Sequence, residues 1–170
     1  KKVLVTGANG FVGSALLPAL AVAGFCPRAA ARNLLPDVDF VLADGLDGQT
    51  KWDDALRGCT HVVHLAARVH LMRDGERNPL GAYRRTNVDG TLNLAKQAAA
   101  WGVRRFVFLS SAKVFGEGSL PGKPFRVGNE LAPGDAYGVS KMEAEEGLFR
   151  ISELTGMEVS SIRPPLVYGP

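Results

Sequence analysis

The segment Val3–Gly13 reads VLVTGANGFVG and constrains the fold more than any other part of this 170-residue chain. A short apolar run ends at Thr6, and three glycines follow at three-residue intervals, Gly7, Gly10 and Gly13. At a strand–helix junction such glycines permit a tight turn, and the N–H groups of the helix start can bind a pyrophosphate. The segment therefore predicts a βαβ unit that binds a dinucleotide. The alternative is a glycine-rich turn without a ligand.

Strand and helix patterns alternate along the whole chain. We expect strands at residues 3–6, 28–31, 40–43, 61–66, 105–109 and 159–162, and helices at 11–23, 52–56, 78–101 and 136–155. A Gly/Pro-rich loop is expected at 116–133. Strands separated by helices form parallel sheets with right-handed crossovers. The predicted fold class is α/β, a Rossmann-like, doubly wound parallel sheet with strand order 3-2-1-4-5-6.

We expect residues 1–170 to form one NAD(P)-binding domain. The sequence stops directly after the last predicted strand, with nothing to cover it. This indicates a chain truncated before a C-terminal substrate-binding region.

The composition excludes several classes of protein. A hydrophobic content of 46% argues against disorder, and the net charge of +3 is too small and scattered for a nucleic-acid surface. No apolar run is long enough for a membrane span. Cys26 and Cys59 have neither metal-site nor disulfide spacing, so we interpret them as small buried residues of a reduced, cytoplasmic protein. No metal site is expected at the histidines, because His61 and His64 should point to opposite faces of one strand, which leaves His70 alone.

A tyrosine and a lysine stand four residues apart in YGVSK, so Tyr137 and Lys141 should share one helix face. A free phenol has a pKa of about 10, and a neighbouring ammonium group would stabilise its phenolate form. Ser111 follows a predicted strand, and its hydroxyl could orient the same substrate oxygen. Alone, the pair would be an ordinary helix-surface feature. Behind a dinucleotide turn, it predicts acid–base catalysis.

Six motifs together resemble the extended short-chain dehydrogenase/reductase family, in the order that the family shows. They are TGANGFVG at 6–13, HLAA at 64–67, TNVDGTLNL at 86–94, FLSSAKVFG at 108–116, YGVSK at 137–141 and RPPLVYGP at 163–170. This family contains NAD(P)-dependent nucleotide-sugar epimerases, dehydratases and reductases. Within it, the chain is most similar to the UDP-glucose 4-epimerase-like enzymes of bacterial surface-polysaccharide gene clusters.

The resemblance implies roles for individual residues. Tyr137 would be the catalytic acid/base, Lys141 would lower its pKa and bind the nicotinamide ribose, and Ser111 would be the hydroxyl partner. Asp44 would face the adenine, and Asn87 would be structural or hold a water. The implied cofactor-binding residues are Gly7, Asn9, Gly10, Phe11, Val12, Gly13, Asp44, Gly45, Leu65, Ala66, Ala67, Asn87, Tyr137, Lys141 and Pro164.

Two departures from the family pattern affect the predicted chemistry. Dehydratases commonly carry Asp-Glu after the catalytic hydroxyl residue, whereas this chain has Ala112-Lys113, which argues against 4,6-dehydration. The carboxylate that normally binds the adenosine 2′-OH is also missing from residues 29–33, which read AAARN. Arg32 could instead pair with a 2′-phosphate, so NADP is favoured over NAD. The alternative is a solvated arginine at a strand end.

The sequence thus predicts an NAD(P)-dependent nucleotide-sugar epimerase or 4-ketoreductase that acts at C4, with a UDP-sugar as substrate. A homodimer is compatible with this interpretation, and neither a nucleic acid nor a membrane is expected as a partner. Two alternatives remain open. One is an NADP-dependent reductase of a non-sugar ketone, and the other is a non-catalytic protein that senses the dinucleotide.

Overall fold

The computed structural model describes residues 1–33, 35–69 and 78–169, and its six strands form one sheet in the order β3-β2-β1-β4-β5-β6. Every neighbouring pair is parallel. The strands are β1 Lys2–Thr6, β2 Cys26–Ala31, β3 Asp39–Leu42, β4 His61–His64, β5 Arg105–Leu109 and β6 Glu158–Ile162. Strand order reverses between β1 and β4, and ligands of such sheets bind beyond the carboxyl ends of the strands at this point. The predicted fold class and strand order are confirmed.

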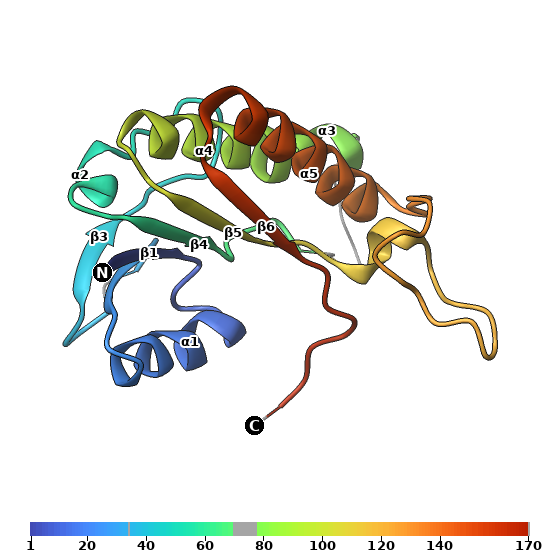
Figure 1. Cartoon of the computed structure of the whole chain (residues 1–170), viewed down its shortest axis with the longest axis horizontal. Helices are drawn as coiled ribbons and strands as arrows, with labels where there is room; N and C mark the ends of the chain where they lie inside the picture. Colours follow the sequence, from blue (N-terminus) through green and yellow to red (C-terminus); the bar gives the residue numbers. More distant parts are fainter. Residues whose placement is uncertain (34, 70–77, 170) are drawn as a thin grey trace.

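Helices cover the two faces of the sheet unequally (Figure 1). Helix α1 lies on one face, whereas α3, α4 and α5 lie on the other. The α-helices are α1 Phe11–Val22, α2 Asp53–Leu56, α3 Pro79–Tyr83, α4 Thr91–Ala100 and α5 Ala136–Thr155. A π-helical turn, η1 Arg84–Gly90, joins α3 to α4, and a 3-10 turn, η2 Ala112–Phe115, follows β5. No helix in the described part of the chain is both long and apolar enough to cross a bilayer.

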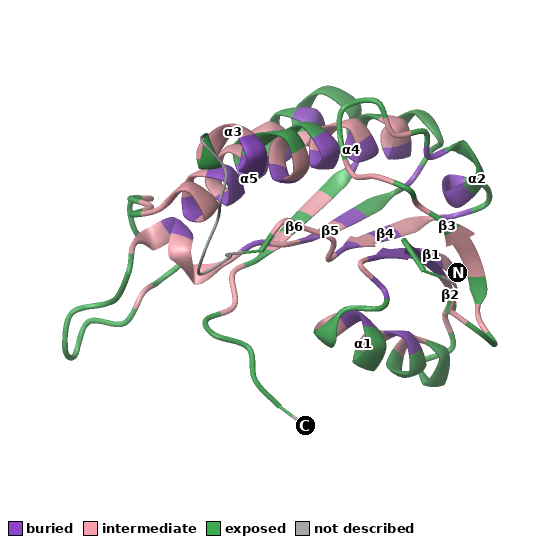
Figure 2. Ribbon diagram, turned by 180° about the vertical axis from the view of Figure 1, so that it is seen from behind, coloured by how far each residue is buried: buried purple, intermediate pink, exposed green. Residues whose placement is uncertain are grey.

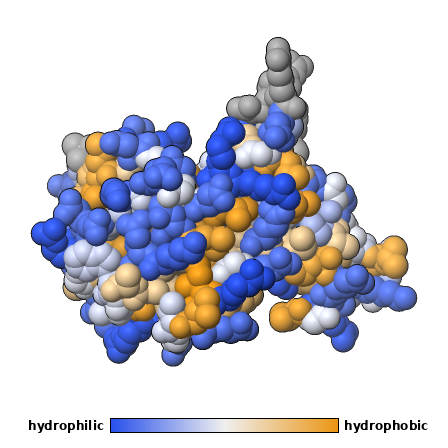
Figure 3. Space-filling model, turned by 90° about the horizontal axis from the view of Figure 1, so that it is seen from above, coloured by the Kyte–Doolittle hydropathy of each residue, from blue (hydrophilic) through white to orange (hydrophobic). Residues whose placement is uncertain are grey.

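The larger hydrophobic core lies between the sheet and the α4–α5 layer. Phe106 and Phe108 of β5, Leu94 of α4 and Leu148 of α5 are completely buried in it. Figure 2 shows the buried positions along the inner sides of these helices and along the central strands. The outer side of the same helical layer is mainly hydrophilic, with apolar patches between the polar side chains (Figure 3). The layer is therefore amphipathic, as expected for helices that cover a sheet.

Three sequence predictions need correction. The strand expected at 61–66 ends at His64, because the chain leaves the ladder beside the turn that follows β1. The helix expected at 78–101 is interrupted by η1, which periodicity does not reveal. Cys26 is exposed rather than buried, because it is the first residue of β2, whereas Cys59 is buried as predicted.

The glycine turn is closed by backbone contacts that leave no room for side chains. Gly7 has a φ of +66°, and a Cβ there would lie 2.7 Å from the nitrogen of Ala66, which stands two residues after β4. A Cβ on Gly13 would lie 2.3 Å from the Gly7 carbonyl oxygen. The turn, helix α1 and the chain after β4 therefore approach one another as closely as backbone allows.

A buried histidine connects β1, β4 and α4 beneath this turn. The His64 Nδ1 atom lies 2.6 Å from Thr6 Oγ1, and its Nε2 atom lies 2.9 Å from Thr91 Oγ1. The ring stacks on Phe108 at a centroid distance of 5.9 Å. Burial, with a smaller contribution from the positive charge of Lys141, lowers the pKa of His64 to about 3. The imidazole is therefore neutral at physiological pH, with one nitrogen donating and the other accepting.

We expect Gly13→Ala to destabilise the fold, because the new methyl group would overlap the Gly7 carbonyl and Ala8 backbone atoms. Overpacking of this kind costs about 1–3 kcal/mol. Urea unfolding measures the loss. Gly118→Ala is the matched control, because a Cβ on Gly118 meets no atom within 4 Å. Equal stabilities of the two variants would contradict this packing.

The stability of the protein should fall as the pH is lowered through the unfolded pKa of histidine. An unfolded His64 binds a proton below a pH of about 6.5, whereas the folded one does not until about 3, so the unfolded state gains protons first. From pH 7.5 to 5 this linkage costs about 2 kcal/mol. In His64→Gln, which does not titrate, urea unfolding at the two pH values should show a correspondingly smaller difference. An unchanged difference would mean that His64 does not contribute to it.

Candidate functional site

The glycine turn and the start of α1 form a cradle for a phosphate group. Gly10 occupies the N-cap position of α1, and no side chain caps this end of the helix. Its first N–H groups and the positive end of its dipole are therefore available to an anion. Because Gly7 and Gly13 carry no Cβ, the glycine turn can pack directly against the start of α1 and the chain after β4, which fixes the position of these N–H groups. The donor set fits the pyrophosphate of a dinucleotide.

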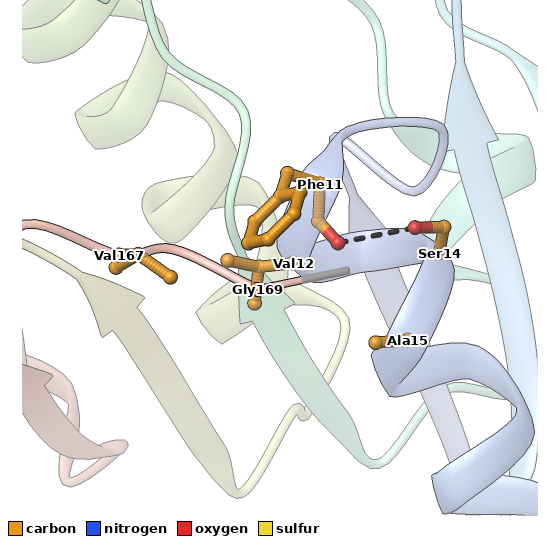
Figure 4. Close-up of a pocket in the computed structure, with 6 residues that line it drawn as sticks. All are labelled: Phe11, Val12, Ser14, Ala15, Val167 and Gly169. Carbon is orange, nitrogen blue, oxygen red and sulfur yellow. Dashed lines mark hydrogen bonds between the residues drawn. The ribbon is translucent and has the colours of Figure 1, made fainter.

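A hollow of about 490 Å³ lies beside this cradle (Figure 4). Its lining residues come from the start of α1 and from the segment that follows β6, and they are Phe11, Val12, Ser14, Ala15, Val167 and Gly169. Ser111, Tyr137 and Lys141 are not among them. The hollow therefore borders the phosphate cradle rather than the predicted catalytic residues.

The predicted hydroxyl partner lies at the carboxyl end of β5. Ser111 is the N-cap of η2, and its Oγ accepts a hydrogen bond from the Lys113 nitrogen at 3.2 Å. The next residue, Ala112, donates its N–H to the Pro164 carbonyl at 2.8 Å. This contact places Pro164, a predicted nicotinamide neighbour, beside the Ser111 turn.

Helix α5 presents Tyr137 to the same region from its first turn. The Asp135 side chain caps α5 by accepting a hydrogen bond from the Gly138 nitrogen at 2.6 Å. Tyr137 is partly buried, and its ring lies edge-on to Tyr83 with centroids 6.0 Å apart. Burial raises the pKa of the Tyr137 phenol, and the Asp135 carboxylate raises it further, while Lys113 and a hydrogen bond with Ser111 lower it.

Lys141 lies one turn after Tyr137 on the same helix face, as predicted, and is only 2% exposed. Its Nζ donates to the Leu109 carbonyl at 2.8 Å and lies 4.5 Å from the centre of the Phe108 ring and 5.9 Å from that of Tyr137. Burial lowers the pKa of Lys141 to about 7, and the Glu145 carboxylate acts in the opposite direction.

The expectation that Lys141 lowers the pKa of Tyr137 stays a prediction. In this structure burial is the main cause that raises the phenol pKa. The hydrogen-bond partner of the Lys141 ammonium group is the Leu109 carbonyl.

A buried ion pair continues the functional face of α5. Glu145, 1% exposed, accepts hydrogen bonds from Arg163 Nε at 3.0 Å and from Ser161 Oγ at 2.7 Å. Arg163 also lies over the Phe115 ring at 4.9 Å. The pair lowers the pKa of Glu145 below its usual value against the effect of burial. It therefore attaches the segment after β6 to the helix that carries Tyr137 and Lys141.

Asn87, predicted to be structural or to hold a water, lies within η1 and is buried. Its Oδ1 accepts from the Arg68 nitrogen at 2.8 Å, and its Nδ2 donates to the Arg68 carbonyl and to Ser140 Oγ, both at 3.0 Å. Ser140 in turn donates to the Tyr137 carbonyl at 2.7 Å. Asn87 thus connects the chain after β4 to the first turn of α5.

The remaining predicted residues lie along the same edge of the sheet. Arg32 is exposed directly after β2, and Asp44 and Gly45 follow β3. Leu65, Ala66 and Ala67 follow β4, and Asn9 lies in the glycine turn. The structure brings Ser111, Tyr137 and Lys141 together, whereas Arg32 and Asp44 belong to the other half of the sheet edge, beyond β1. This is the arrangement that a ligand spanning the edge requires.

No metal centre appears in the described part of the chain, where no three His, Cys, Asp or Glu side chains form a suitable group. His61 is half-buried at its side of β4, whereas His64 is fully buried. His70 lies outside the described residues.

Sequence reasoning missed three groups around the site: Asp135, Ser140 and the Glu145–Arg163 pair. A helix N-cap pattern was available for Asp135, which stands three residues before Gly138 at the start of a predicted helix. The ion pair had no such signal, because its members are separated in sequence and Glu145 resembles a solvated helix residue.

Comparisons with known proteins agree with this geometry. The profile of the NAD dependent epimerase/dehydratase family matches residues 3–170. The UDP-glucose 4-epimerase of Vibrio cholerae is 44% identical over 173 residues, which cover 100% of this chain and 53% of the relative. A dihydroflavonol 4-reductase of Arabidopsis thaliana is 34% identical over 194 residues, covering 99% of this chain and 50% of the relative. The chain spans about half the length of these curated relatives.

Solved structures show the same fold. A short-chain dehydrogenase/reductase superfamily protein from Agrobacterium tumefaciens with bound NAD superposes with a TM-score of 0.83 at 32% identity, over 96% of this chain and 48% of that chain. MoeE5 in complex with UDP-glucuronic acid and NAD gives a TM-score of 0.81 at 30% identity, over 95% of this chain and 52% of that chain. With the family profile matching from the first strand to the end of the chain, the protein belongs to the NAD-dependent epimerase/dehydratase family.

Proposed function

We propose that the chain is the nucleotide-binding part of an enzyme that epimerises or reduces a UDP-sugar at C4 with NAD(P). The observation that carries the proposal is the convergence of Ser111, Tyr137 and Lys141 at the sheet edge that also holds the glycine cradle. A phosphate cradle alone would suit a binding protein. The phenol, hydroxyl and amine beside it supply the groups that proton transfer needs.

The bound nicotinamide would supply hydride transfer, and its oxidised ring would supply a positive charge. Tyr137 exchanges a proton with the substrate hydroxyl at C4. Ser111, which hydrogen-bonds the phenol, orients the same substrate oxygen. Lys141 contributes its charge when protonated, and its burial keeps water away from that charge. A raised phenol pKa suits Tyr137 as the proton donor, whereas positive charge beside it is needed for the reverse direction.

Support for a UDP-sugar comes from the relatives. UDP-glucose 4-epimerase is the name of the Vibrio cholerae relative, and UDP-glucuronic acid is bound in the MoeE5 structure. We propose that further substrate contacts come from the part of these longer proteins that this chain does not span. A second candidate, reduction of a non-sugar ketone, is favoured by the similarity to dihydroflavonol 4-reductase. Turnover of the full-length protein with UDP-glucose, UDP-N-acetylglucosamine and dihydroflavonols separates the two.

Tyr137→Phe should abolish turnover in the full-length protein while leaving cofactor affinity nearly unchanged. The substitution removes the proton-transferring oxygen but keeps the ring that packs against Tyr83. General acid–base catalysis contributes about 10²- to 10⁴-fold in rate, so kcat should fall by at least that lower factor. Lys141→Met, measured alongside, should reduce both kcat and cofactor affinity. A Tyr137→Phe enzyme that keeps more than about a tenth of kcat would refute the assignment.

The protein should prefer NADP over NAD through Arg32. No carboxylate follows β2 to repel a 2′-phosphate, and the exposed Arg32 guanidinium can pair with one. Such a bond contributes about 1.5–3 kcal/mol, or about ten- to a hundredfold in affinity. The lower value is expected at an exposed position, and added salt should weaken the preference. Calorimetric titration of both cofactors against wild type and Arg32→Ala measures it.

Arg57→Ala is the matched control, because this exposed arginine pairs with Asp54 on α2. Equal affinities of the wild type for NAD and NADP would leave Arg32 as a solvated surface residue. The same conclusion would follow if Arg32→Ala bound NADP as tightly as wild type.

A further inference from the structure

An ion pair joins the two segments that carry Ser111 and Tyr137. Lys113 stands two residues after Ser111, and Asp135 stands two residues before Tyr137. The Lys113 Nζ lies 2.5 Å from Asp135 Oδ2 and 3.3 Å from Glu117 Oε2. The Asp135 side chain is 22% exposed and that of Lys113 is 35% exposed, so the contact is partly shielded from solvent.

The same two residues take part in the local structure at each site residue. Lys113 donates its backbone N–H to Ser111 Oγ, and Asp135 caps α5 through the Gly138 nitrogen. A Cβ on Gly138 would lie 2.8 Å from the Lys113 carbonyl oxygen, so η2 and the start of α5 are in direct contact. An exposed loop of about twenty residues connects these segments along the chain, and near its end the Ala132 nitrogen donates to the Val114 carbonyl of η2 at 3.0 Å. The ion pair adds a side-chain contact between the two segments to this backbone hydrogen bond.

The negative charge of the Asp135 cap makes ionisation of the nearby Tyr137 phenol less favourable. Carboxylates are favoured at a helix N-terminus, but Asp135 disfavours the ionised form of Tyr137 and so raises its pKa. The other described groups that face this phenol are Tyr83 from α3, Ser111 and Lys113 from the β5 side, and Lys141 from α5 itself. Among the groups that shift the phenol pKa, Lys113 is the cation, and it lowers this pKa.

We propose that Lys113 is a positioning residue for the reaction at Tyr137: its ammonium group holds the start of α5 against the Ser111 turn and compensates the charge of the Asp135 cap. The helix thereby keeps a strong cap without losing the acidity of its catalytic phenol. The catalytic consequence rests on the function proposed above, whereas the charge compensation does not.

The test titrates the Tyr137 phenol directly. The chain contains three tyrosines, so the NMR signal of isotopically labelled Tyr137 can be assigned by its loss in Tyr137→Phe. Lys113→Met should raise the phenol pKa, because the compensating cation is removed. Asp135→Asn should lower it, because the amide keeps the capping oxygen without the charge. The double variant should lie between the two, and Lys113→Arg should resemble wild type.

Circular dichroism at each pH identifies any variant that does not fold. If Lys113→Met does not fold, the phenol pKa values of Lys113→Arg and Asp135→Asn still test the proposal. In the full-length protein, the acid limb of the kcat/KM profile should move with the phenol, to higher pH in Lys113→Met and to lower pH in Asp135→Asn. Each pH unit of movement changes the rate at a fixed pH on this limb about tenfold. The proposal would be overturned if the phenol titrated at the same pH in Lys113→Met, Asp135→Asn and wild type. It would also be overturned if the phenol pKa moved in the same direction in both variants. Shifted titrations in a protein without UDP-sugar turnover would support it and refute the proposed function instead.

Discussion

The close approach of two backbones at the centre of the sheet sets the conditions for the rest of the site. β1 and β4 are neighbours where the strand order reverses, and the turn after β1 passes within contact distance of the chain after β4. Only glycine at position 7 permits this approach. The start of α1 is fixed by the same contact, and beneath it His64 joins β1 and β4 to α4. The steric constraint at Gly7 thus fixes the glycine turn, and the buried His64 connects the strands below it to the helical layer.

Helix α5 is held on its functional face by partners from other elements. Asp135 at its cap meets Lys113, Lys141 meets the Leu109 carbonyl, and Glu145 meets Arg163. Lys141 and Glu145 are four residues apart and share one side of the helix, whereas Asp135 stands at its N-cap. All three partners lie in or directly after β5 and β6. The orientation of Tyr137 is therefore fixed by polar contacts as well as by the apolar core.

Much of this arrangement could be predicted from the sequence, and the exceptions have physical reasons. The glycine spacing and the strand–helix alternation predict the sheet order, because handedness rules leave few alternatives. YGVSK predicts that Tyr137 and Lys141 share a face, because helix geometry is regular. The π-helical turn at 84–90 and the exposure of Cys26 depend on tertiary packing and sheet edges, which periodicity does not encode. The pKa of Tyr137 depends on burial and on the Asp135 carboxylate, which the spacing of Tyr137 and Lys141 does not determine.

Because Lys141 is buried, the binding of a ligand at this site is thermodynamically linked to the protonation of its amine. With a pKa of about 7, this amine is divided between its neutral and charged forms in a neutral solution. Any ligand that accepts a hydrogen bond from the ammonium form draws a proton from the buffer as it binds. The affinity of such a ligand should weaken with rising pH, and its heat of binding should contain the ionisation enthalpy of the buffer. In the empty protein the Lys141 amine is then partly deprotonated, and the binding of such a ligand protonates it fully.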